Sequence, residues 1–229
     1  MKIVALVPMK ANSERVKGKN FKDFCGKPLF RWILDTLESI DEIDKIVINT
    51  DARDILFKHN LIDSKKILIR DRKQEICGDL VSMNKVIQDD VSNIDADFYI
   101  MTHTTNPLVS HNSIKQAIAI FKEALAEKKA DSLFSVTKFQ ERLYDSQVHA
   151  LNHDPKNLIR TQDLNPLFIE NSNLYLFTND SFRKTNARIG INPMILETDQ
   201  RESIDIDTTY DWELAEIMVE YYKMKGIIR

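Results

Sequence analysis

Short apolar runs alternate with longer amphipathic stretches along most of this chain, and this alternation limits the possible folds more than any other feature. The runs are rich in Val, Ile, Leu and Phe, as is typical of strands buried on both faces of a parallel sheet. We therefore predict seven strands. They cover Ile3–Pro8, Lys45–Thr50, Lys66–Arg70, Asp97–His103, Ser132–Thr137, Asn173–Thr178 and Met194–Glu197.

The stretches between the strands predict helices that each have one apolar face. Ser113–Lys128 is the clearest, because its apolar residues recur every three or four positions. Pro28 is expected to open an earlier helix. Asp79 is expected to cap another, whose apolar face includes Leu80. The remaining predicted helices are Ala52–Asn60 and Asp211–Met224.

Alternating strands and helices predict an α/β fold with a mostly parallel, doubly wound sheet, because right-handed crossovers place helices on both faces. The length of the chain suits a single domain over residues 1–229. Residues 139–168 break the alternation, since they are polar, contain Pro155 and Pro166, and have no clear period. Such an insert is typically a lid, a substrate loop or a dimerisation arm, with a plain surface excursion as the alternative.

Charge and cysteine content exclude several classes of protein. Lysine and arginine number 32 against 35 acidic residues, a net charge of -3, so we expect no nucleic-acid partner. Cys25 and Cys77 cannot by themselves make a disulfide scaffold or a four-ligand zinc site. The first apolar run is too short to span a bilayer, and no cleavage site of small residues follows it. We expect a cytoplasmic protein that has no membrane partner.

A basic loop follows the first predicted strand. Its four cations are Lys10, Arg15, Lys17 and Lys19. In a doubly wound sheet the carboxyl ends of the strands form the ligand crevice, and the loop is expected there. Cationic side chains and backbone N–H groups together suit a polyphosphate. A solvated loop without a ligand is the alternative.

The loop does not match the common glycine-rich phosphate loops. Gly18-Lys19 is followed by Asn20, and Ser13 stands where a Walker A loop has its first glycine. The chain has no G-x-G-x-x-G run and only 5 glycines in 229 residues. A dinucleotide-binding oxidoreductase is therefore a poor fit.

Two carboxylates stand near the end of the chain, where Asp205 and Asp207 alternate with Ile204 and Ile206. In an extended segment the two carboxylates point to one face and lie about 7 Å apart, so they could bind Mg²⁺ directly or through water. Capping of the following helix by Asp207 or Thr208 is the alternative. An acidic pair and a cationic loop together suit phosphoryl-type chemistry, which needs a metal and charge-neutralising donors.

These segments resemble the motifs of the acylneuraminate cytidylyltransferase family, which opens with a pattern close to P-A-R-G-G-S-K-R-I-P-G-K-N. The matching positions are Pro8, Ser13, Arg15, Gly18, Lys19 and Asn20. Residues 26–29 resemble the G-K-P-L of the family, Asp51 its S-T-D, and Asp205–Thr208 its closing D-I-D-T. The similarity runs from residue 2 to about residue 217 and is weakest in the insert.

The resemblance implies a nucleotide-diphospho-sugar transferase-like fold in which residues 139–168 are the dimerisation segment of a homodimer. It implies attack of an acceptor hydroxyl on the α-phosphate of CTP, with release of pyrophosphate. The implied acceptor is a small acidic molecule, a 3-deoxy-2-keto sugar acid of the sialic, legionaminic, pseudaminic or octulosonate type. The same transfer to a phosphonate, or nucleotide binding without catalysis, are the alternatives.

The resemblance also implies roles for individual residues. Mg²⁺ is expected on Asp205 and Asp207, and the expected catalytic residues are Lys10, Arg15, Lys19 and Asp207. The residues expected to bind the nucleotide are Lys10, Ser13, Arg15, Lys19, Asn20, Arg70 and Ser82.

The acceptor side departs from the pattern of the family. Sialic-acid activators carry F-R-P-N-G in a later strand, whereas this chain has Phe168-Ile169-Glu170-Asn171-Ser172 and lacks the arginine. Arg160 in the insert is a candidate substitute. His103 ends a central strand and is expected to face the acceptor, with a structural histidine as the alternative. The residues expected to bind the acceptor are His103, Thr104, Arg160, Glu170 and Asn171.

Overall fold

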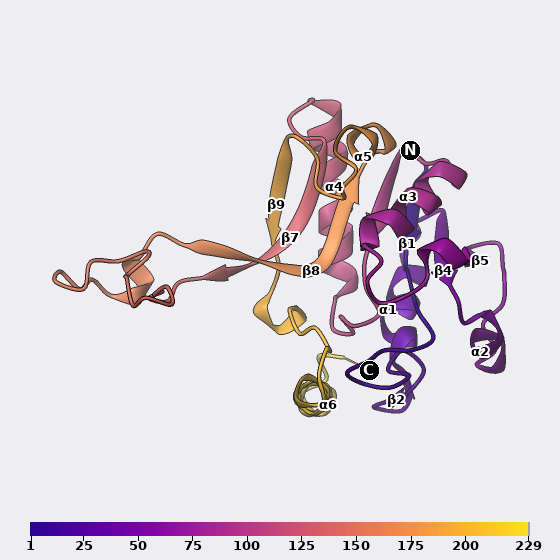
Figure 1. The fold of residues 1–229 in the computed structure, drawn as a ribbon, viewed down its shortest axis with the longest axis horizontal. Helices are drawn as coiled ribbons and strands as arrows, with labels where there is room; N and C mark the ends of the chain where they lie inside the picture. Colours follow the sequence, from indigo (N-terminus) through magenta and orange to yellow (C-terminus); the bar gives the residue numbers. More distant parts are fainter. Residues whose placement is uncertain (229) are drawn as a thin grey trace.

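The computed structural model describes residues 1–228, so the last residue of the predicted domain lies outside the described residues. Within them, the central sheet has the strand order β5-β4-β1-β6-β8-β7-β9 (Figure 1). All seven predicted strands are present. Their bounds are β1 Ile3–Leu6, β4 Lys45–Thr50, β5 Ile67–Asp71, β6 Phe98–Met101, β7 Ser132–Phe139, β8 Leu167–Phe177 and β9 Pro193–Glu197.

The sheet is mostly parallel, as predicted. Strands β5, β4, β1 and β6 run parallel to one another, as do β7 and β9, whereas β8 runs antiparallel to both of its neighbours. Strands β1, β4 and β6 are almost wholly buried, because helices cover both faces of this part of the sheet. The doubly wound α/β architecture is thus confirmed.

The described residues form six α-helices. They are α1 Leu29–Glu38, α2 Arg53–Lys58, α3 Met83–Asn93, α4 His111–Ala126, α5 Asn179–Thr185 and α6 Thr209–Met224. Short 3₁₀ helices cover η1 Gln74–Ile76, η2 Thr161–Asp163 and η3 Gln200–Glu202.

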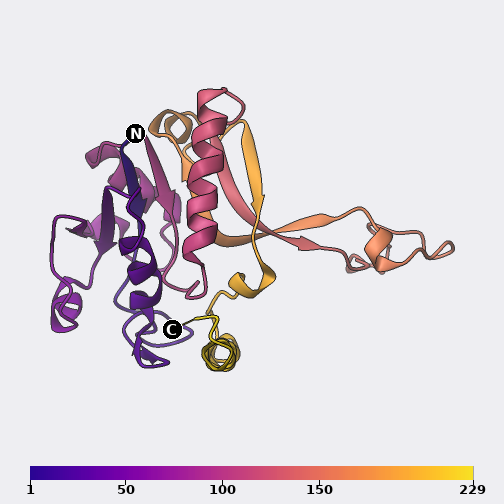
Figure 2. The ribbon, with the colours of Figure 1, turned by 180° about the vertical axis from the view of Figure 1, so that it is seen from behind.

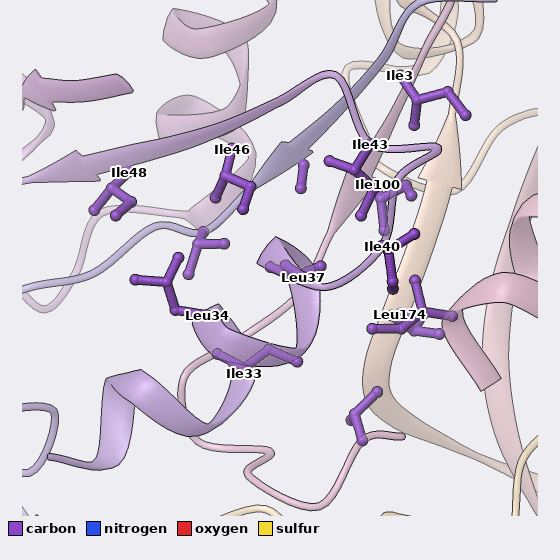
Figure 3. Close-up of a cluster of buried hydrophobic side chains, with 14 of the residues drawn as sticks. Ile3, Ile33, Leu34, Leu37, Ile40, Ile43, Ile46, Ile48, Ile100 and Leu174 are labelled. Atoms are coloured by element: carbon purple, nitrogen blue, oxygen red, sulfur yellow. The ribbon is translucent and has the colours of Figure 1, made fainter. Parts of the chain in front are cut away.

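Two apolar clusters fix the helices on opposite faces of the sheet. Helices α1 and α4 share one cluster with the sheet, and α3 and α5 share the other. Figure 3 shows Ile33, Leu34 and Leu37 of α1 lying against isoleucines of the strands. Figure 2, which views the molecule from behind, shows α4 lying along the sheet. Helix α6 packs instead on the loop after β1, through Trp212, Ala215 and Val219.

The predicted start of the third helix is wrong. Helix α3 begins at Met83, and the side chain of Ser82 caps it by accepting a hydrogen bond from the Asn84 backbone N–H. Asp79 lies in a turn before the helix and pairs with Lys10 instead, and the Leu80 side chain is fully exposed. Gly78, with φ of +108° in the left-handed region, lies in the turn that precedes the helix.

Residues 136–170, which include the end of β7 and the start of β8, project from the body as a long arm (Figure 1). The predicted insert, residues 139–168, lies in this arm. The base of the arm is a two-stranded ribbon paired from Val136↔Glu170 to Phe139↔Leu167, so the strands extend further than their apolar runs indicate.

A bulge separates this ribbon from the sheet. The pairing Phe134↔Tyr175 changes register before Val136↔Glu170, so Ser135 alone stands opposite residues 171–174 of β8. Ser172 within that stretch has φ of +58°, in the left-handed region. Such bulges redirect a strand and its side chains, and here the bulge lies beside the cavity described next.

Candidate active site

A cavity of about 400 Å³ opens beyond the carboxyl ends of β1 and β6. Most of the predicted site residues meet there, although they come from distant parts of the sequence. The loop after β1 and the carboxylate segment before α6 supply most of them. The predicted residues that line the cavity are Lys10, Ser13, Lys19, Asn20, His103, Thr104, Asp205 and Asp207.

Asn20 holds the basic loop in shape. Its side-chain amide donates to the Lys10 carbonyl at 2.8 Å, and its amide oxygen accepts from the Thr104 hydroxyl at 2.7 Å. Both Asn20 and Thr104 are buried. Their polar groups are therefore used to join the loop to the end of β6, which sets the position of Lys10 and Ser13.

Lys19 links the loop to the carboxylate segment. Its ammonium group is buried and donates to the Ile206 carbonyl at 2.6 Å and to Asp207 Oδ1 at 3.0 Å. Arg15 donates to the other oxygen of Asp207 at 2.8 Å. Both oxygens of Asp207 thus accept from cations, and the first and last motifs of the sequence form one structure.

The alternation of aspartate and isoleucine places the two carboxylates as predicted. Ile206 is fully buried against Phe24 and Trp212, while Asp205 and Asp207 line the cavity. Thr208 caps α6 and forms a capping box with Asp211. Of the two predicted cap residues, Asp207 and Thr208, Thr208 is therefore the cap, and the Asp207 carboxylate lines the cavity.

Asp205 provides the test of whether this site fits a cation. Within residues 1–228 its buried Oδ1 has no hydrogen-bond partner. Burial raises the pKa of Asp205 above its ordinary value, and the charge of Asp207 adds to the effect. A carboxylate oxygen without a partner beside a second carboxylate fits a hard divalent cation. In the described chain no third His, Cys, Asp or Glu joins them, so water and substrate oxygens would complete the shell.

Arg70 and Ser82 do not line the cavity. Arg70 pairs with Asp89 at 3.0 Å and with Asp90, both on α3, and Ser82 is the cap of that helix. Arg72 lines the cavity instead, with its guanidinium donating to the backbone carbonyls of Asn49 at 2.8 Å and Met9 at 3.3 Å. Its position just past the end of β5 was the only indication in the sequence.

His103 lines the cavity as predicted, and its imidazole is surrounded by positive charge. Burial, together with the charges of Arg188 and Lys19, lowers the pKa of His103 to about 4. The imidazole is therefore neutral at pH 7, when it offers one donor and one acceptor to a bound molecule.

The depressed pKa of His103 predicts a dependence of stability on pH. The folded state resists protonation of His103, so its contribution to stability is complete above pH 6.5 and is lost as the pH falls toward about 4. We expect wild type to lose about 2 kcal/mol more free energy of unfolding than His103→Asn between pH 7 and pH 4.5. Urea unfolding at the two pH values measures this; equal losses would contradict it.

The three other residues predicted to bind the acceptor lie outside this cavity. Arg160 pairs with Asp163 on the arm at 2.7 Å. Glu170 accepts from the Tyr175 hydroxyl and lies with Ser172 in an adjoining cavity of about 480 Å³. Asn171 is buried, and its amide group bonds to polar side chains of three neighbouring segments. Its partners are Ser135 at 2.7 Å, Thr137 at 3.0 Å, Thr198 at 2.8 Å and Ser203 at 3.3 Å.

These contacts predict that Asn171 is needed for stability. Asn171→Ala removes several hydrogen bonds from one buried polar network, so we expect the free energy of unfolding to fall by about 2–4 kcal/mol. Asn112→Ala, on the exposed side of α4, is the control and should change it by under about 0.5 kcal/mol. Urea unfolding of both variants measures this. Equal stabilities for the two would show that the buried network contributes little.

Comparison with known proteins agrees with this geometry. A family model described as cytidylyltransferase matches residues 4–224. A pseudaminic acid cytidylyltransferase of Campylobacter jejuni is 25% identical over 231 residues, covering 95% of this chain and 96% of that protein. A CMP-N,N'-diacetyllegionaminic acid synthase of Legionella pneumophila is 26% identical over 240 residues, covering 96% and 97%.

The fold also matches solved structures. A CMP:2-keto-3-deoxy-manno-octonic acid synthetase complexed with CTP superposes with a TM-score of 0.67 at 13% identity, covering 96% of this chain and 99% of that one. A 4-diphosphocytidyl-2C-methyl-D-erythritol synthase from Anaerococcus prevotii gives 0.65 at 12% identity, covering 96% and 99%. None of the helices in residues 1–228 has the length and apolar character needed to cross a membrane.

Proposed function

Since the chain belongs to the cytidylyltransferase family, we propose that it transfers CMP from CTP to a 3-deoxy-2-keto sugar acid and releases pyrophosphate. The full-length relatives named above act, by their names, on pseudaminic and legionaminic acids. The observation that carries the proposal is the meeting of the basic loop and the carboxylate pair in one cavity, joined by Lys19.

The arrangement of charge in the cavity supports this reaction. The acceptor hydroxyl oxygen forms a bond to the α-phosphorus and loses its proton to water. The bond from the α-phosphorus to the bridging oxygen of the β-phosphate breaks, and pyrophosphate leaves with the electron pair. Lys10, Ser13 and Arg72 line the cavity, and the proposal assigns the triphosphate to them. Fixed donors of this kind stabilise the charge that moves onto the leaving group, and no nucleophile from the protein is required.

We propose that Asp205 and Asp207 hold Mg²⁺ in this reaction. The partnerless oxygen of Asp205 and the position of Asp207 beside it support the assignment. When bound, the ion would neutralise phosphate charge and lower the pKa of the attacking hydroxyl. Treatment with EDTA should abolish turnover and added Mg²⁺ should restore it. Full activity after exhaustive chelation would contradict the assignment.

Pyrophosphate release tests the reaction directly. The enzyme is incubated with CTP, Mg²⁺ and, one at a time, pseudaminic, legionaminic, N-acetylneuraminic and 3-deoxy-manno-octulosonic acids, with a phosphonate as a non-sugar acceptor. UTP and ATP replace CTP as controls. Release with CTP and one sugar acid supports the proposal. Binding of CTP without release from any acceptor would favour a non-catalytic nucleotide-binding protein instead.

We further propose that the chain acts as a homodimer that assembles through the arm. Several large apolar side chains of the arm are exposed in one chain, including Leu158 at 63%, Phe168 at 44% and Ile169 at 50%. Exposed apolar groups on a projecting ribbon are typical of an interface. Light scattering should give the mass of two chains. A monomer mass at micromolar concentration would overturn this part of the proposal.

A further inference from the structure

Arg188 is a cation of the cavity that no motif of the sequence indicates. It lies in the segment between α5 and β9 and lines the cavity together with His103 and Ser172. These neighbours come from the end of β6 and from β8, whereas Lys10, Ser13 and Lys19 come from the loop after β1. Arg188 is therefore the cation of the cavity that lies with residues of β6 and β8 and not in the loop after β1.

Two neighbours fix the guanidinium of Arg188. It lies over the ring of the buried Tyr175, with 3.9 Å between the guanidinium carbon and the ring centroid. The Tyr175 hydroxyl donates to Glu170, whose carboxylate lies 3.7 Å from Arg188, too far for a hydrogen bond. The side chain of Arg188 is only 22% exposed. Stacking and the nearby negative charge thus hold the guanidinium in place without using its N–H groups.

The other cations of the cavity already have partners. Lys10 pairs with Asp79, Lys19 with Asp207 and the Ile206 carbonyl, and Arg72 with backbone carbonyls. By contrast, the Arg188 guanidinium donates no hydrogen bond to any group in residues 1–228. Over the part of the chain that the structure describes, none of the Arg188 nitrogens is a buried atom without a partner, so its N–H donors face the open cavity, where a ligand can bind them in place of water.

We propose that Arg188 binds the carboxylate of the acceptor and so replaces the arginine that is missing from the F-R-P-N-G position. The proposal rests on the proposed function. A planar fork of N–H donors matches a carboxylate in a bidentate arrangement, which a lysine does not provide. Glu170 beside it faces the adjoining cavity, where it can accept from hydroxyl or amide groups of the same molecule.

The test compares acceptor kinetics of Arg188→Met and Arg188→Lys with wild type, using the sugar acid that gives the fastest pyrophosphate release. Methionine keeps an apolar contact with Tyr175 but has no charge. We expect the KM for the acid to rise about 30- to 100-fold in Arg188→Met and about 10-fold in Arg188→Lys, while the KM for CTP stays within about twofold. Arg183→Met, on the exposed side of α5, is the control and should match wild type.

The primary carboxamide of the same sugar acid distinguishes binding from a structural role. Wild type should prefer the acid over the amide by about 100-fold in kcat/KM, and Arg188→Met by less than about 10-fold. An active wild type whose Arg188→Met variant keeps the same preference would overturn the assignment and leave the reaction standing. Wild type that releases no pyrophosphate with any sugar acid would overturn the proposed function, and the assignment with it.

Discussion

Replacing Asp207 with asparagine is expected to lower kcat about a thousandfold while CTP affinity changes by less than about threefold. Asp207 accepts from Lys19 and Arg15 and lies beside Asp205 in the cavity, so the substitution removes charge at the proposed reacting centre. Asparagine keeps the shape and one acceptor oxygen. Steady-state pyrophosphate release and calorimetric titration with CTP measure the two quantities separately.

The matched control for this substitution is Asp180→Asn. Asp180 forms an exposed ion pair with Lys184 in the first turn of α5, and such pairs contribute little. We expect its kcat within about twofold of wild type. If Asp207→Asn kept more than about a tenth of wild-type turnover, the carboxylate pair would not be the reacting centre.

Replacing Lys19 with methionine is expected to lower kcat/KM about 100- to 1000-fold and the free energy of unfolding by about 2 kcal/mol. The buried ammonium group contributes to both quantities, because it bonds to the Ile206 carbonyl and to Asp207, nearly 190 residues away in sequence. Lys19→Arg keeps the charge but needs more space, and should recover only part of the activity. Pyrophosphate release and urea unfolding provide the measurements.

Lys17→Met is the comparison for Lys19→Met, since it removes another cation of the same loop. Lys17 is exposed and does not line the cavity. We expect its kcat/KM to fall less than about threefold, through loss of long-range attraction alone. Equal losses in the two variants would mean that net charge of the loop, and not the bonds of Lys19, supports the reaction.

The sequence predicted best those strands in which nearly every successive residue is buried. Strands β1, β4 and β6 are apolar at nearly every position because helices cover both of their faces. Helix α5 was missed because it is short and polar, with only Ser181 and Phe182 buried. The first half of β8 was missed because the arm ribbon is exposed on both sides and has no apolar period.

The site divides in the same way. Residues in contiguous motifs, such as Lys19 and Asp207, were found, since each motif is compact and the parallel sheet brings the ends of its strands to one edge. Arg70 was predicted and Arg72 was not, because the sequence does not show that Arg70 on β5 is neutralised by α3 while Arg72, just past the strand, lines the cavity. Arg188 was missed altogether. Its place in the cavity depends on tertiary packing against Tyr175, which no local pattern encodes.

The number of residues in the bulge opposite Ser135 affects the geometry of the site. Four residues of β8 stand opposite one of β7, so β8 carries an odd excess of residues. Successive side chains of a strand point to opposite faces of the sheet. An odd number of extra residues therefore reverses the face to which each later side chain of the strand would point. Glu170 and Tyr175, separated by an odd interval, can therefore meet on one side and hold Arg188. Inserting or deleting one residue within 171–174 is therefore expected to turn Glu170 away from Tyr175 and Arg188.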